Sequence, residues 1–379
     1  MKVELINLQK NIVVNLKLLV YKENSCLVNK INFKVDDIFL EPLLFIYFNT
    51  KKDDSFSKEI LTEILQGYYT EKENLKIKHS FNKDNIAYIP NIGYFAKNED
   101  QPFENIKFIP NTKIELILYP VIHTKSIFKD FKNQIIEESE IEISKSLCES
   151  YIEKLSNALQ LIKTNCFDHY QQIEQCCKKI ILFKTNPKNT NSFATINAHG
   201  IAFLNVCQDD YDEVFFVDDI AHQTGHIIMT TILFERKKYF KINENENIGS
   251  IINQESEYRS LYVLFHALYT YYTTLLCLDK CSTNNCFDKT QTYEAIARIG
   301  FYLIKYRNDL IKFEQVVSHY TIIDNVLTND GINIFKLIKD KYIEMHTKWY
   351  DIIFKFNYKN QPYNFTLKDF LIQNPYKNA

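Results

Sequence analysis

Two histidines four residues apart, His222 and His226, lie in the apolar stretch Val217–Phe234. On a helix, residues at this spacing share one face, one turn apart, so both imidazoles can reach a single metal ion. In the zinc motif H-E-x-x-H, the glutamate between two such histidines acts as a general base. Here Gln223 takes that position, and an amide cannot accept a proton from metal-bound water. The stretch therefore predicts a metal-binding helix and argues against an ordinary hydrolase.

A third histidine, His266, stands in the apolar segment RSLYVLFHALYTYY. A histidine buried among Leu, Phe and Tyr needs a partner for its ring nitrogens. One interpretation is a hydrogen bond to a backbone carbonyl or a tyrosine. The other is metal ligation together with His222 and His226, which would leave open coordination positions and suit Zn(II) or Fe(II). Asp218 and Glu257 are the alternative ligands if the site has two histidines and one carboxylate.

Arginine is rare in this chain: there are four arginines and 41 lysines, and the arginines all fall between residues 236 and 307. Arg259 lies seven residues before His266, two turns along the same helical face. It is placed to bind a carboxylate in bidentate fashion, such as one end of 2-oxoglutarate whose other end reaches the metal. Arg298 and Arg307 are the further candidates. The structural alternative for Arg259 is an ion pair with Glu255 or Glu257.

Composition limits the class of protein. The chain of 379 residues is 46% apolar, which suggests two domains with a buried core. Its net charge of −2, without blocks of like charge, argues against nucleic-acid binding. Nine cysteines, an odd number that includes the adjacent Cys176 and Cys177, favour reduced thiols and a cytoplasmic location. Cys277, Cys281 and Cys286 cluster without a C-x-x-C pair, which is a weak metal signal.

Other common classes are not indicated. The first residues, MKVELINLQKN, lack the apolar run of a secretory signal. Leu261–Leu278 has no charge over eighteen residues, but its His, Tyr and Thr content predicts a buried core helix and not a membrane span. The seven glycines form neither G-x-G-x-x-G nor a P-loop, which excludes nucleotide sites built on those loops.

The apolar patterns predict an α+β protein in two regions. Residues 1–130 are expected to be rich in strands, from KVELINL, NIVVNLKLLVY, CLVNKINFKV and KIELILYPVIH, with one helix at 56–69. This region is a candidate for recognition of a peptide or partner protein. Residues 131–379 are expected to be mainly helical, zincin-like and metal-binding.

The second region should contain two strands, at 178–185 and 192–206, before the histidine helix. His199-Gly200 is expected to form a bend or bulge within this strand pair. The histidine helix should begin near Asp218 or Asp219, where a carboxylate caps free N–H groups, and run to about Lys238. The further helices are expected at 135–177, 257–279, 289–306, 310–326 and 331–354.

At these residues the sequence resembles the HExxH-type peptide-modification proteins, also described as 2-oxoglutarate-dependent HExxH-type peptide β-hydroxylases. The resemblance covers about residues 190–335. The matching segments are AHGIAFLNV, AHQTGHIIM, RSLYVLFHALY and, more loosely, IDNVLTNDGINIF. The chain departs from the family at Gln223, where the family has glutamate. It also has NQESEYR where the family often has a Trp-Arg-Asp segment.

The resemblance implies Fe(II)-dependent oxygen insertion at a β-carbon of a ribosomally made peptide, with 2-oxoglutarate converted to succinate. Such a cycle needs no glutamate base, so Gln223 would orient a ligand or water by hydrogen bonding. The peptide is expected beside the strand that contains His199-Gly200. The alternatives are a zincin-like hydrolase or its inactive descendant, and a non-catalytic peptide-binding or scaffold protein. Neither nucleic acid nor membrane is an expected partner, and the oligomeric state is not indicated.

Overall fold

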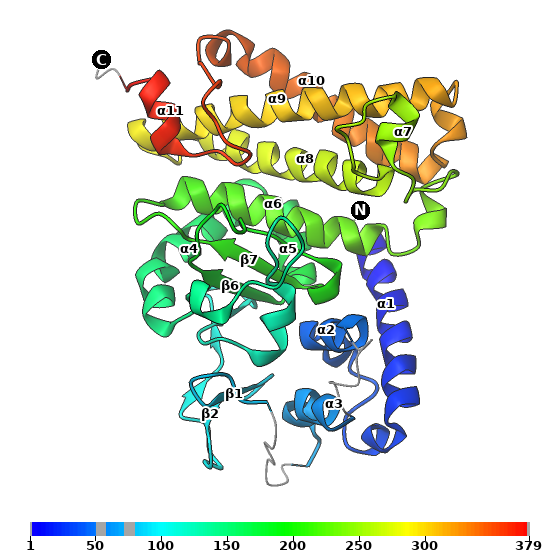
Figure 1. Cartoon of the computed structure of the whole chain (residues 1–379), viewed down its shortest axis with the longest axis vertical. Coiled ribbons are helices and arrows are strands. Elements are labelled where there is room, and N and C mark those ends of the chain that lie inside the picture. Colours follow the sequence, from blue (N-terminus) through cyan, green and yellow to red (C-terminus); the bar gives the residue numbers. More distant parts are fainter. Residues whose placement is uncertain (1, 51–57, 72–79, 377–379) are drawn as a thin grey trace. The chain divides into compact units, whose positions relative to one another are not determined.

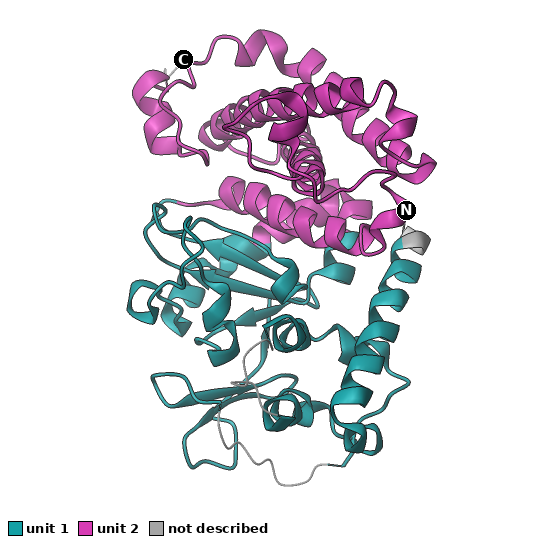
Figure 2. Cartoon of the chain, turned by 45° about the vertical axis from the view of Figure 1, so that its right-hand side comes forward, with its two compact units in different colours: residues 1–156, 171–210 teal, residues 157–170, 211–379 magenta. Residues whose placement is uncertain are grey.

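The computed structural model describes residues 2–50, 58–71 and 80–376. The chain forms two compact units, the first made of residues 1–156 and 171–210 and the second of residues 157–170 and 211–379 (Figure 2). This division differs from the sequence-based boundary near residue 130. The reason is that the strands at 179–183 and 201–205 extend a sheet that starts in the first 130 residues, which joins them to the first unit.

The chain begins with a helix where two strands were predicted. Lys2–Glu23 forms α1 (Figure 1), so the strands predicted from KVELINL and NIVVNLKLLVY are wrong. Its buried residues recur every three or four positions, which is the helical period: Leu5, Leu8, Ile12 and Leu16. Leu18 and Leu19 are exposed although apolar. They made the run look continuously apolar and thereby obscured this period.

The next segment of the first unit is also helical. CLVNKINFKV, a predicted strand, contains the 3-10 turn Ser25–Asn29 instead. It is followed by α2 (Pro42–Thr50) and α3 (Lys58–Leu65). The helix predicted at 56–69 corresponds to α3 and the 3-10 turn Gln66–Tyr68, while residues 56 and 57 lie outside the described part of the chain.

Two small sheets complete the first unit. One is antiparallel and consists of β1 (Ile86–Ile89), β2 (Gly93–Ala96) and β3 (Glu104–Asn105). The other has the order β4 (Lys107–Phe108), β5 (Glu115–Ile117), β6 (Lys179–Phe183) and β7 (Ile201–Asn205). Strands β5, β6 and β7 are parallel, and every residue of β6 and β7 is buried. Buried parallel strands read as continuous apolar runs, and this pattern predicted β6 closely. The second strand, predicted at 192–206, is confirmed only from residue 201, because Ile196–Ala198 form a 3-10 turn.

The chain between β5 and β6 is mostly helical, as predicted. It contains α4 (Lys145–Asn165) and α5 (Phe167–Cys176). The expected apolar face of α4 is confirmed, because its members are all buried: Leu147, Tyr151, Leu155, Leu159 and Ile162.

The second unit consists mainly of helices, and α6 and α8 pack against each other, as do α8 and α9 (Figure 1). The helices are α6 (Glu213–Ile232), α7 (Ile248–Ile252), α8 (Leu261–Thr283), α9 (Lys289–His319), α10 (Asn329–Ile353) and α11 (Leu367–Gln373). Two helices predicted at 289–306 and 310–326 are thus one helix, α9, because the polar residues between them include neither proline nor glycine.

The start of α6 also differs from the prediction. Asp212, and not Asp218 or Asp219, caps it, and the Asp212 side chain accepts a hydrogen bond from the Val214 N–H at 2.9 Å. Helix α8 likewise begins at Leu261, where the Ser260 hydroxyl accepts a hydrogen bond from the Val263 N–H. Helix α6 thus begins before the predicted start at Asp218 or Asp219, and α8 begins after the predicted start at Glu257. In both helices a side-chain cap defines the first turn.

In the described part of the chain, α8 is the single helix long and apolar enough to cross a membrane. Within the structure, 72% of its apolar window is buried. This burial agrees with the buried core helix that the sequence predicted.

Candidate functional site

The candidate site is built on one face of α6. His222 and His226 are separated by one helical turn, and their ring centres lie 5.3 Å apart. Both side chains keep part of their surface exposed. The two imidazoles are therefore largely, but not fully, covered by neighbouring side chains.

The third histidine lies opposite this face on α8. The rings of His226 and His266 are 5.9 Å apart and almost parallel, at 16°. The ring of Tyr262, one turn before His266, packs against it at 4.4 Å. The structure thus brings the three predicted ligands together as a row, with His226 in the middle.

Gly225 allows α6 and α8 to lie this close. A Cβ atom at this position would lie 2.5 Å from the Thr273 hydroxyl oxygen and 3.3 Å from Thr270 Cα. The Thr273 hydroxyl cannot easily yield, because it donates a hydrogen bond to the Ala221 carbonyl at 2.8 Å. Glycine inside a helix costs about 1 kcal/mol relative to alanine, and here this cost is offset by close contact between the helices next to His226.

The three imidazoles are neutral near pH 7. Burial lowers the pKa of His226 to about 4. Burial, reinforced by His226 and Lys305, holds the pKa of His222 well below its usual range, and burial with His226 and Arg236 does the same for His266. Neutral imidazole is the form that binds a metal ion. The Nε2 atom of His266 is buried without a hydrogen-bond partner, which is costly unless a ligand binds there.

The residues fit a metal ion by type and protonation, and two of the histidine pairs also fit by the distance between their rings. With metal–nitrogen bonds of about 2.0–2.1 Å, two imidazoles on one ion place their ring centres roughly 5 Å apart. The two observed distances, 5.3 and 5.9 Å, are close to this value. In the orientations seen, however, no three His, Cys, Asp or Glu side chains among the described residues converge on one point. A three-histidine ion site at this face would therefore need a rearrangement of the side chains from the orientations seen.

Gln223 points toward the start of its own helix. Its Nε2 donates a hydrogen bond to Asp219 Oδ1 at 3.1 Å, and its side chain is buried. An amide in this position orients Asp219 but accepts no proton from a reacting group.

Arg259 is fully engaged by two carboxylates. Its guanidinium donates two hydrogen bonds to Glu257, at 2.9 and 2.7 Å, and two to Asp309, at 2.8 and 2.7 Å. Glu257 also pairs with Lys312. The structure thus places Arg259 in an ion pair with Glu257, the structural alternative, and both of these groups are engaged by protein partners.

A second buried ion-pair group involves Asp218, the other proposed carboxylate ligand. Arg298 Nη1 donates to Asp218 at 2.7 Å, and its guanidinium also pairs with Glu294. All three side chains are at least 92% buried. Arg298 is therefore committed to protein carboxylates, whereas Arg307, the remaining candidate, is exposed on α9.

Three residues that the sequence did not single out surround His222. The rings of Tyr302 and Tyr271 lie 5.7 and 6.2 Å from its ring, and Lys305 lies above the Tyr271 ring at 5.9 Å. Tyr302 and Lys305 are three residues apart and so share one face of α9. This spacing is visible in the sequence, but nothing there indicates that α9 meets the histidine helices.

Other expectations concern the first unit and the cysteines. Gly200 has a φ of +95° and lies in a turn before β7, so the expected bend at His199-Gly200 is present and the alternative, a bulge, is not. Phe203 of β7 exchanges backbone hydrogen bonds with Phe193, both at 2.9 Å. This part of the strand edge is therefore already paired and is not available to pair with a peptide.

Cys277 and Cys281 are buried in α8, and burial raises the pKa of Cys281.

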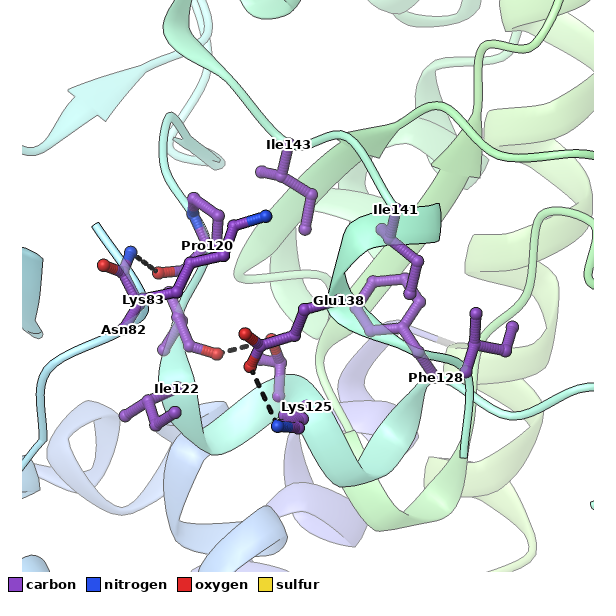
Figure 3. Close-up of a pocket in the computed structure, with 12 residues that line it drawn as sticks. Asn82, Lys83, Pro120, Ile122, Lys125, Phe128, Glu138, Ile141 and Ile143 are labelled. Atoms are coloured by element: carbon purple, nitrogen blue, oxygen red, sulfur yellow. Dashed lines mark hydrogen bonds and ion pairs between the residues drawn. The ribbon is translucent and has the colours of Figure 1, made fainter. Parts of the chain in front are cut away.

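The first unit contains a pocket of about 450 Å³, a volume that includes space open to solvent (Figure 3). Its walls are mostly apolar and are formed by Pro120, Val121, Ile122, Phe128, Ile136, Ile141 and Ile143. Lys83, Lys125 and Glu138 also line it, and Lys125 pairs with Glu138 at 3.4 Å. The pocket offers apolar contact and two positive charges against one negative charge.

Comparisons with known proteins add no assignment to this geometry: no protein-family model and no curated protein matches the sequence.

Proposed function

We propose that this chain is a metal-dependent peptide-modifying oxygenase, with Fe(II) held by His222, His226 and His266 and 2-oxoglutarate as cosubstrate. One observation carries the proposal: three neutral imidazoles lie in a row on α6 and α8, with His226 in the middle, and the His266 ring has a buried nitrogen without a hydrogen-bond partner. The two-histidine helix packed against a third histidine is also why we propose a zincin-like second unit. When bound, iron would supply the oxidation of a peptide C–H group to an alcohol by dioxygen, with 2-oxoglutarate converted to succinate and carbon dioxide.

Gln223 favours the oxygenase over a hydrolase. A zinc hydrolase needs a base to take a proton from water, and the Gln223 amide cannot do so. Removal of hydrogen from a carbon does not require that base. In this proposal Gln223 positions Asp219 at the start of the histidine face, through the hydrogen bond of 3.1 Å.

The proposed substrate is a ribosomally made peptide, and the proposed location is the cytoplasm, where nine free thiols stay reduced. The pocket of the first unit supports peptide recognition, because it can take one branched or aromatic side chain with an acidic residue beside Lys83 or Lys125.

The deciding experiment uses protein purified without a histidine tag. Metal content is measured first, and Fe(II) and 2-oxoglutarate are then titrated together without oxygen. A visible charge-transfer band is the expected result. Iron-loaded protein without a band would overturn the oxygenase, and peptidase activity gained by zinc-loaded Gln223→Glu would support the lapsed hydrolase. Protein that binds no metal at all would favour the non-catalytic scaffold.

Recognition by the pocket has its own test. Tryptophan at Ile122, a pocket-lining residue with partial exposure, is expected to fill the pocket and weaken peptide binding about tenfold, or roughly 1.4 kcal/mol. The probes are labelled short peptides with one Leu, Ile or Phe flanked by Asp, and the readout is fluorescence polarisation. Ile135→Trp is the control, because Ile135 is 54% exposed and does not line the pocket. Equal affinity of the Ile122→Trp variant and the wild type would rule out recognition by this pocket.

A further inference from the structure

Most positive charges around the three histidines are already neutralised by carboxylates. Arg259 is paired with Glu257 and Asp309, and Arg298 with Asp218 and Glu294. Arg236 donates to Glu244 and stacks on the Tyr262 ring at 4.0 Å. None of these three guanidinium groups offers a charge to an anionic ligand.

Lys305 differs from all of them. Among the described residues, no carboxylate lies within 4.0 Å of its ammonium group, and its one hydrogen bond goes to the Tyr363 carbonyl at 2.9 Å. The ammonium lies 4.0 Å from the centre of the Tyr363 ring and 5.2 Å from that of Phe301. An ammonium has three N–H donors, so two remain for a ligand.

The position of Lys305 points to the histidine face. Tyr302, one turn before Lys305 on α9, contacts the ring of His222. The Tyr271 ring lies beneath the Lys305 ammonium and contacts the rings of His222 and Tyr302. The charge of Lys305 contributes to the lowered pKa of His222, which reflects the same proximity. Lys305 is only partly buried and can therefore be reached by a small molecule. Burial lowers the pKa of Lys305 to about 8, although the charges of Asp309 and Asp218 act in the opposite direction.

We propose that Lys305 is the residue that binds the carboxylate of a small aliphatic acid at this site, in the role that the sequence suggested for Arg259. The aromatic walls of Tyr271 and Tyr302 suit the carbon chain of the acid, and the single ammonium suits one carboxylate. That the acid is a dicarboxylate such as 2-oxoglutarate rests on the proposed function. Binding of a carboxylate at Lys305 does not require a metal ion.

The test compares wild type, Lys305→Gln and Arg307→Gln. Arg307 is the control because it carries the same charge two residues away on α9 but is exposed. Succinate and 2-oxoglutarate are titrated calorimetrically into each protein, both metal-free and loaded with Co(II). Lys305→Gln is expected to weaken binding of both acids at least tenfold, while Arg307→Gln stays within twofold of wild type. Circular dichroism establishes that each variant is folded.

Three results would overturn the proposal: Lys305→Gln binds as well as wild type, Arg307→Gln loses as much affinity, or wild type binds neither acid in either form. Failure of the proposed function is distinguishable from these results. In that case wild type takes up no Co(II), while the loss of succinate binding by metal-free Lys305→Gln still assigns the carboxylate site.

Discussion

An Arg298→Met variant is expected to lose about 3–5 kcal/mol of folding stability, because it would leave Asp218 and Glu294 buried without a cation. The Arg298 side chain is 4% exposed and pairs with both carboxylates. Burial raises the pKa of Asp218 and of Glu294 in spite of the neighbouring Arg298, so the charges are costly even when paired. Urea denaturation followed by circular dichroism measures the loss.

Two further variants make this result specific. Arg307→Met, the same substitution at an exposed position of α9, should change stability by less than about 0.5 kcal/mol. The triple variant Asp218→Asn, Glu294→Gln, Arg298→Met removes all three charges and should regain most of the stability lost by Arg298→Met. If Arg298→Met alone unfolds at the same urea concentration as wild type, Asp218 and Glu294 are not the buried charged partners of Arg298 described above.

A His266→Leu variant is expected to be more stable than wild type in the absence of metal and to lose stabilisation by metal. Leucine removes the buried Nε2 atom, whose missing hydrogen bond costs about 1–3 kcal/mol. Wild type should gain about 2.7 kcal/mol at an ion concentration a hundred times Kd, and the variant should gain much less. Thermal unfolding with a chelator, with Co(II) and with Zn(II) measures both effects.

The two effects of His266→Leu have opposite signs, which separates a ligand from a core residue. A histidine with only a packing role would change the metal-free stability and leave metal uptake unaltered. His319→Leu, at an exposed position near the end of α9, is the control and should affect neither quantity. Retained metal content in His266→Leu would exclude His266 as a ligand.

The sequence was sufficient to predict the parts of the fold whose pattern is local. The spacing of His222 and His226 and the apolar run around His266 led to α6 and α8, and the structure brings these helices together. Strand β6 and the second half of the strand predicted at 192–206, which is β7, were also predicted, since buried parallel strands are continuous apolar runs.

What the sequence did not indicate depends on contacts between distant residues. Arg259 pairs with Asp309, which lies fifty positions later in the chain. The sequence alone therefore did not show that the charge of Arg259 is neutralised. The position of Lys305 beside His222 likewise depends on how α9 packs. In α1 the local signal itself was misleading, because exposed Leu18 and Leu19 lie among the buried residues of the helix.

Gly225 would limit which ions fit the proposed metal site. Because the two helices touch where a methyl group would not fit, they cannot move closer to enclose a smaller ion. The contact of Gly225 with Thr270 and Thr273 therefore sets the minimum distance between the backbones that carry His226 and His266. Only rotation of the imidazole rings would then adjust the proposed site to an ion. A Gly225→Ala substitution would push α6 and α8 apart and lengthen the distance between His226 and His266. The proposed site would then prefer larger ions before it lost ion binding altogether.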